Sequence, residues 1–147
     1  MIELTRRRDP HRPDRWKIYF GDVCVGDIGP RAGVPTTVDQ WEWYCGFVPP
    51  ARRGVDAGGT AIDLHDARKK FADAWQSLQT TFTDDDFAEY RYARAWTAWK
   101  ERMWKDGRKL PTQTQNGRSR CFCGSEIDIR GMAAHVRAAH ITESANV

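Results

Sequence analysis

Apolar and polar residues alternate in three segments of the N-terminal half, and this period of two predicts β-strands. The first two segments, residues 16–20 and 23–28, are separated by Gly21-Asp22, which is typical of a hairpin turn. The third, residues 40–48, ends at Pro49-Pro50, because proline has no amide hydrogen to donate to a ladder. Its alternate residues share one face: Trp41, Trp43, Cys45 and Phe47. We therefore expect a three-stranded antiparallel sheet.

The next segment, residues 63–78, has the period of an amphipathic helix that begins after Asp63 as its N-cap. Its apolar residues recur three or four positions apart: Leu64, Ala67, Phe71, Ala74, Trp75 and Leu78. We expect this stripe to cover the apolar face of the sheet, so the predicted fold class is α+β.

A second helix is predicted over residues 83–105, with Thr83 as its cap and three aspartates in its first turn. Its aromatic residues lie on more than one face, because Trp99 and Trp104 are about 140° apart around an ideal helix. Trp96, Trp99 and Trp104 therefore form a candidate interaction surface. We expect at least one of them to be covered by a partner protein, by a second copy of the chain in a homodimer, or by the C-terminal segment.

These elements divide the 147 residues into an α+β domain at 16–106 and smaller flanking segments. Residues 1–15 are polar, basic and interrupted by proline, which predicts a flexible arm. Residues 107–118 are a polar, basic linker, residues 119–142 form a small C-terminal module, and residues 143–147 are a tail. Seven tryptophans and 40% hydrophobic residues are enough to build a packed core.

The net charge of +3 is unevenly distributed along the chain. Residues 91–147 contain eleven Lys/Arg and five Asp/Glu, whereas residues 1–90 contain twelve Lys/Arg and fifteen Asp/Glu. A basic C-terminal third is expected of a protein with a polyanionic partner such as nucleic acid. The alternative is that these cations only solvate a helix face and a linker.

The C-terminal module carries two thiols and two imidazoles, at Cys121, Cys123, His135 and His140, with the spacing C-x-C-x11-H-x4-H. These are the groups that tetrahedral Zn²⁺ prefers. A segment this short cannot order itself by burying apolar surface, so one structural zinc ion would supply the missing folding free energy. The alternative is a buried or redox-active cysteine pair beside two solvated histidines.

The module resembles a C2H2 zinc finger, with Ile127 and Met132 at the two apolar positions and Gly124 in the knuckle. The module departs from the finger pattern in two places, since one residue is missing between the cysteines and one before the helix. The cysteines are closer in sequence, so Phe122 must sit in a tight turn. The histidines, five residues apart, would point about 140° apart on an ideal helix, so the helix must tighten or unwind near His140.

The finger resemblance also bears on how DNA would be contacted. The three helix positions that read bases in such fingers are occupied here by Asp128, Gly131 and Ala134, of which two have no hydrogen-bonding side chain. Weak sequence preference is the expectation. Four arginines surround the motif and suit phosphates or an acidic protein surface: Arg118, Arg120, Arg130 and Arg137.

The strand and helix order over residues 16–80 resembles AP2 and integrase-type DNA-binding domains, which read the major groove with a three-stranded sheet. The outward face of the sheet argues against that use here. It offers one cation and one carboxylate among Lys17, Tyr19, Glu42 and Tyr44, which does not favour approach to phosphates.

Other function classes are disfavoured. The sequence has no Gly-rich phosphate loop, nucleophile elbow or H-E-x-x-H motif, and two cysteines with two histidines leave zinc no open position, so we expect no enzyme activity. No apolar run reaches the roughly 20 residues that span a bilayer, and residues 1–8 have no signal-peptide h-region. Four reduced cysteines, with Cys24 and Cys45 as small packed hydrophobes, favour a cytoplasmic or nucleoid-associated protein without membrane partners.

The leading hypothesis is a zinc-binding protein that binds DNA through backbone contacts with weak sequence preference, in a role such as gene regulation. The competing hypothesis is a protein–protein interaction adaptor or inhibitor that docks through the aromatic helix and the finger.

Overall fold

The computed structural model describes residues 3–141, and the chain separates into two compact units between Phe87 and Ala88. We call these the N-terminal unit, described over residues 3–87, and the C-terminal unit, described over residues 88–141. Among the described residues, none of the helices combines the length and the apolar character that crossing a bilayer requires.

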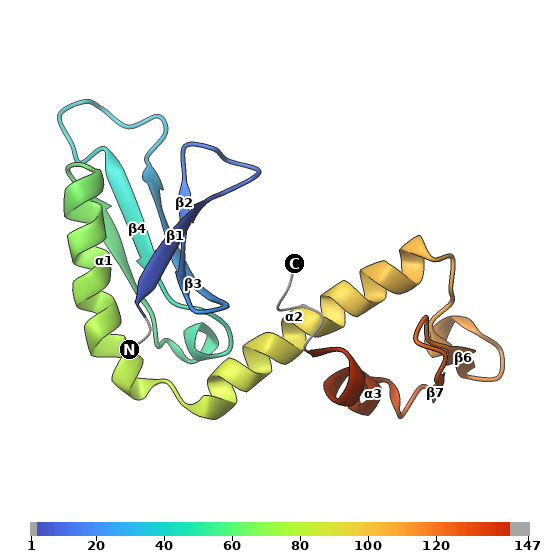
Figure 1. The fold of residues 1–147 in the computed structure, drawn as a ribbon. Coiled ribbons are helices and arrows are strands. Elements are labelled where there is room, and N and C mark those ends of the chain that lie inside the picture. Colours follow the sequence, from blue (N-terminus) through green and yellow to red (C-terminus); the bar gives the residue numbers. More distant parts are fainter. Residues whose placement is uncertain (1–2, 142–147) are drawn as a thin grey trace. The chain divides into compact units, whose positions relative to one another are not determined.

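The N-terminal unit is built on a five-stranded antiparallel sheet in which each strand pairs with the next one along the chain (Figure 1). The strands are β1 (Leu4–Arg8), β2 (Trp16–Phe20), β3 (Val23–Pro30), β4 (Trp41–Cys45) and β5 (Ala57–Ala61). A short 3-10 helix, Pro50–Arg53, lies between β4 and β5. The mixed α+β class is confirmed, and the prediction of three strands is wrong.

The two missed strands, β1 and β5, lie at the edges of the sheet. The flexible arm predicted over residues 1–15 contains β1, which pairs with β2 from Leu4↔Phe20 to Arg8↔Trp16. β1 shows no apolar alternation because its arginines are largely exposed, and they pack instead by laying guanidinium groups over Trp16 and Tyr19. β5 contains two adjacent glycines, which carry no side-chain pattern.

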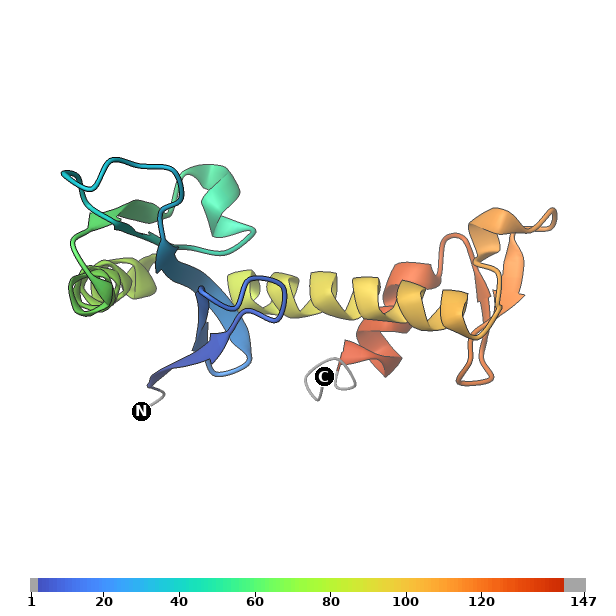
Figure 2. The ribbon, with the colours of Figure 1, turned by 90° about the horizontal axis from the view of Figure 1, so that it is seen from above.

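Helix α1 (Leu64–Leu78) lies against one face of the sheet and is seen end-on in Figure 2. It begins as predicted, with the side chain of Asp63 accepting a hydrogen bond from the Asp66 amide at 2.7 Å. Phe71, buried with Ala67 and Trp75, approaches the sheet at Gly26. A Cβ atom at Gly26 would collide with the Tyr44 carbonyl oxygen and the Phe71 ring, and the φ of +150° also favours glycine there.

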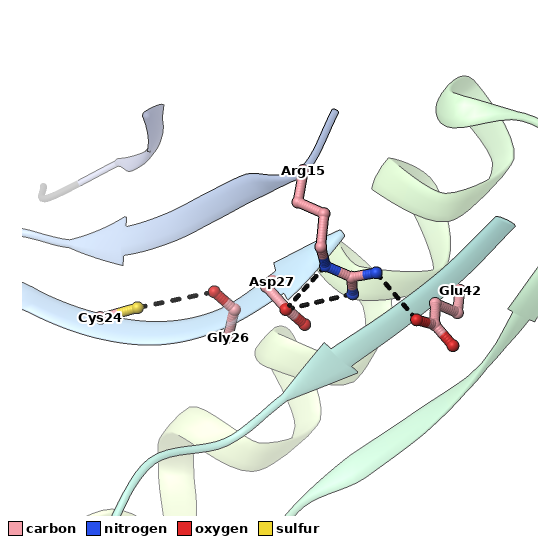
Figure 3. Close-up of polar contacts among 5 residues, drawn as sticks. All are labelled: Arg15, Cys24, Gly26, Asp27 and Glu42. Atoms are coloured by element: carbon pink, nitrogen blue, oxygen red, sulfur yellow. Dashed lines mark hydrogen bonds and ion pairs between the residues drawn. The ribbon is translucent and has the colours of Figure 1, made fainter. Parts of the chain in front are cut away.

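The opposite face of the sheet holds a buried arginine, Arg15, which is 5% exposed (Figure 3). Its guanidinium donates to Asp27 Oδ2 on β3 at 3.1 and 3.3 Å and to Glu42 Oε1 on β4 at 2.8 Å. Burial lowers the pKa of Arg15, but these two carboxylates outweigh burial and raise it. One cation is thus held by two carboxylates, which gives this cluster a net negative charge.

Helix α2 (Asp84–Lys105) contains the boundary between the two units, since Phe87 closes the first and Ala88 opens the second. In the N-terminal unit, Phe87 stacks on Phe47 with ring centroids 5.1 Å apart. After α2, the C-terminal unit contains a short 3-10 helix (Pro111–Gln113), a hairpin of β6 (Arg118–Arg120) and β7 (Glu126–Asp128), and helix α3 (Met132–Ala139).

The C-terminal unit has a core that the sequence did not predict. Six buried residues from α2, the hairpin and α3 form it: Ala95, Trp99, Met103, Cys121, Ile127 and Val136. Most of α2 therefore belongs with residues 119–141, which we call the finger-like segment, and its assignment to the domain at 16–106 is wrong for residues 88–105. The predicted linker is also ordered in part, because Pro111 is buried and Leu110 packs on this core. Residue 142 and the predicted tail, 143–147, lie outside the described residues.

Candidate metal centre

The hairpin between β6 and β7 places both cysteines on a tight knuckle. The Cys121 amide donates to the Ser125 carbonyl at 2.8 Å, and the Gly124 amide donates to the Cys121 carbonyl at 2.9 Å. Gly124 has a φ of +96°, a conformation that other residues rarely adopt. Phe122 thus sits in the turn that the short cysteine spacing requires.

Helix α3 supplies the two histidines. Its start is held by Asp128, whose carboxylate accepts a hydrogen bond from the Gly131 amide at 2.6 Å. His135 is the fourth residue of the helix, whereas His140 follows the last helical residue, with φ −124° and ψ −1°. The helix ends just before His140, as the spacing of the two histidines required. Because the backbone at His140 is no longer helical, both imidazoles can face the knuckle.

The four side chains converge on one point. Sγ of Cys121 lies 3.4 Å from Nε2 of His140, and Sγ of Cys123 lies 3.6 Å from Nε2 of His135. The two imidazole Nε2 atoms are 3.1 Å apart. All four ligand atoms lie within 4.8 Å of one another. They are close enough to hold a metal ion.

The centre is half enclosed by protein. Cys121 and His140 are buried, His135 is half-buried and Cys123 is exposed. The buried side is closed by Trp99 of α2, whose indole Nε1–H donates to Sγ of Cys121 at 3.3 Å. Sequence reasoning did not assign Trp99 to this site, and the nearest signal was the aromatic pattern on several faces of α2.

The two thiols ionise differently. Burial raises the pKa of Cys121. Burial also disfavours the thiolate of Cys123, but hydrogen bonds with Ser125, Cys121 and His140 outweigh it and lower the pKa to about 6. Cys123 is therefore the thiol that is ready to ligate near neutral pH, since the thiolate is the form that binds metals.

The four arginines that were predicted to contact a partner differ in how strongly they interact with other residues of the unit. Arg118 and Arg130 are exposed and form no ion pair within residues 3–141. Arg120 is exposed and donates to the Gly124 carbonyl at 2.8 Å. Arg137 is engaged by α2, because it pairs with Glu89 at 3.1 Å and its guanidinium carbon lies 3.7 Å from the centroid of the Tyr92 ring.

The three tryptophans of the predicted interaction surface also differ in how deeply they are buried. Trp99 is 2% exposed in the core of the C-terminal unit, so the C-terminal segment, one of the three coverings expected for this surface, is what covers it. Trp96 is half-buried beside it, with ring centroids 5.5 Å apart. Trp104 is 80% exposed. The finger-like segment therefore covers one side of α2, and Trp104 stays on the surface of the unit.

No protein-family model, curated protein or solved structure matches this chain.

Proposed function

We propose that the C-terminal unit is a zinc-stabilised module that binds DNA through its phosphate backbone, with weak sequence preference, in a role such as gene regulation. The observation that carries the proposal is a metal-competent Cys2His2 cluster within a strongly basic unit. Residues 88–141 contain eleven Lys/Arg and five Asp/Glu.

Zinc is the ion that best fits the four ligands. Tetrahedral bonds of about 2.3 Å to sulfur and about 2.0–2.1 Å to nitrogen give sulfur–nitrogen edges of about 3.6 Å and a nitrogen–nitrogen edge of about 3.3 Å. Three of the six corresponding distances here are 3.4, 3.6 and 3.1 Å, and all six are within 4.8 Å. Cys121, Cys123, His135 and His140 would hold the ion, which would supply folding free energy to the unit. Four protein ligands leave no open position, so we propose a structural role without catalysis.

The charge of the unit favours nucleic acid as the partner. Arg118 on β6 and Arg130 in the turn after β7 are exposed, and Lys100 and Lys105 are exposed on α2. Exposed cations without strong internal partners can neutralise phosphates and so release the counterions bound there. This release is the main source of nucleic-acid affinity that does not depend on base sequence.

Base reading is weakly supported by the same geometry. Asp128, the one polar side chain at the base-reading positions of a finger, already accepts a hydrogen bond from the Gly131 amide. Gly131 and Ala134 have no side-chain hydrogen-bonding group. Contacts to phosphate would therefore dominate, and binding would vary little with sequence.

A second candidate function, a protein-interaction adaptor or inhibitor with an acidic partner, is favoured by one observation. Trp104 is 80% exposed and Ile129 is 51% exposed in the C-terminal unit. Exposed tryptophans are common anchors in protein interfaces. The same ring could stack on a nucleobase, so Trp104 by itself does not separate the two functions.

The test is a salt-titrated fluorescence anisotropy assay with labelled single-stranded DNA, double-stranded DNA and RNA of mixed sequence. We expect DNA binding that weakens steeply with salt and that R118Q/R130Q weakens on every sequence. The matched control is R12Q/R52Q, which removes two exposed arginines from the N-terminal unit. An affinity indifferent to salt, or equal losses in both double variants, would contradict the proposal.

A further inference from the structure

A pocket of about 440 Å³ lies within the N-terminal unit, between α1 and the β1–β3 part of the sheet. Its floor is apolar and is formed by the buried side chains of Ile18, Ile28 and Phe71. Leu4 and Ala72 extend this apolar surface towards the opening. The pocket is within the size range of small-molecule sites, which is about 300–1,000 Å³.

The rim of the pocket is basic. His65, Arg68 and Lys69 project from α1, with Ala72 one turn further on the same face, and Arg6 contributes from β1 on the other side. The guanidinium of Arg6 lies over the Trp16 ring, with its central carbon 4.5 Å from the ring centroid. Arg68 and Lys69 form no ion pair within residues 3–141, while the adjacent Lys70 is paired with Asp66.

The positive charge around the pocket is opposite in sign to the net charge of residues 1–87. Residues 1–87 contain fourteen Asp/Glu and twelve Lys/Arg, yet none of the described residues that line the pocket is acidic. Three permanent cations and one histidine gathered around an apolar floor are complementary to an anion that carries an apolar chain or ring.

We propose that this pocket binds a small amphipathic carboxylate. The apolar part would cover Ile18, Ile28 and Phe71, and the carboxylate would accept hydrogen bonds from Arg68, Lys69 and Arg6 at the rim. A small molecule is favoured over a peptide because the apolar floor is a single local depression with cations on two sides. The site is independent of the metal centre, since all of its lining residues belong to the N-terminal unit.

The test is calorimetric titration of the 147-residue chain, purified in the presence of zinc, with decanoate below the concentration at which decanoate forms micelles. Decyltrimethylammonium, which has the same chain and the opposite charge, is the matched probe. We expect one decanoate per chain and little binding of the cation. R68Q/K69Q should weaken decanoate binding about tenfold. A72F should abolish it, because the ring at this exposed helical position would occupy the pocket.

Two control variants make the same substitutions away from the pocket. K100Q/K105Q removes the same charge from α2, and A93F adds the same ring to an exposed alanine of α2, so both should bind decanoate like the unmodified protein. Circular dichroism spectra would verify that each variant is folded. The proposal is overturned if decanoate does not saturate, if A72F binds it normally, or if the cation binds as tightly. It is also overturned if an acidic apolar peptide, but not decanoate, binds in a manner that A72F blocks.

Discussion

The indole Nε1–H of Trp99 donates a hydrogen bond to Sγ of Cys121 at 3.3 Å, which links the second half of α2 to the first candidate metal ligand. The two residues are both buried and share one core. A hydrogen bond to a ligating sulfur fixes its orientation and disperses the negative charge of the thiolate. The candidate metal centre is therefore built on α2 as well as on the hairpin and α3.

Replacing Trp99 by Phe should lower zinc affinity about tenfold, because outer-shell partners of metal ligands typically contribute that much or more. Competition with a chromophoric chelator measures the change. Since Trp99→Phe also leaves a void, Met103→Ala serves as a packing control in the same core, and Trp104→Phe serves as a surface control. An equal loss of affinity in M103A would assign the effect to packing rather than to the hydrogen bond.

Removing a ligand should remove the metal. We expect one zinc per chain by elemental analysis, and Cys121→Ser or Cys123→Ser should each lose most of it, because serine does not supply a thiolate. Cys24→Ser is the matched control, since Cys24 lies in β3 of the other unit. Stoichiometric zinc in both ligand variants would show that the cluster is not the binding site.

Chelation should unfold more than the finger-like segment. Because Ala95, Trp99 and Met103 share a core with the hairpin and α3, EDTA should also raise hydrogen exchange over the second half of α2. Amides of β2–β4 in the N-terminal unit should keep their protection. Exchange confined to residues 119–141 would mean that α2 is stable without its partners.

The start of α2 should make stability depend on pH at the acid end. The Asp86 carboxylate accepts hydrogen bonds from the Thr83 amide at 3.0 Å and from Arg53 at 3.1 Å, and the Thr83 amide is the main cause of its lowered pKa. Asp86→Ala should cost about 1 kcal/mol of unfolding free energy at neutral pH. Asp85→Ala, which removes an exposed carboxylate from the same turn, should cost much less.

The sign of this effect follows from the direction of the shift. A carboxylate whose pKa is lowered in the folded state stabilises the protein above its ordinary value of 3.8, and this contribution is lost as the pH falls below that value. The difference between the unmodified protein and D86A should therefore be constant near neutrality and shrink towards pH 3. Urea unfolding at a series of pH values measures it, and a difference that grows in acid would contradict the assignment.

The sequence predicted the elements whose side chains carry a periodic pattern. The strands with apolar alternation, β2, β3 and β4, and the capped helix α1 were found close to their positions. Strands β1 and β5 were missed because an arginine-rich edge and a Gly-Gly pair show no such pattern, and only pairing with neighbours orders them. Edge strands are commonly polar, so alternation is a poor guide to them.

The clustering of the four candidate metal ligands was predictable because their chemistry is local in sequence. Four residues of two ligand types, thiol and imidazole, within twenty positions favour convergence whatever the rest of the fold does. The role of Trp99 was not predictable in this way, because it lies 22 residues before Cys121 and nothing in the pattern of α2 indicates which element covers each face. Tertiary packing decided that α2 belongs mainly to the C-terminal unit.

The core of the C-terminal unit is shared between α2 and the finger-like segment, and this determines which fragment could fold when fused to another protein. A fragment that begins at residue 119 would carry all four ligands and three of the six buried core residues, because Ala95, Trp99 and Met103 would stay behind. Grafting such a fragment onto another protein would expose Cys121, Ile127 and Val136 to water. A portable fragment would have to include α2 from about Ala88, so the folding unit around the candidate metal centre is nearly three times as long as the Cys121–His140 motif.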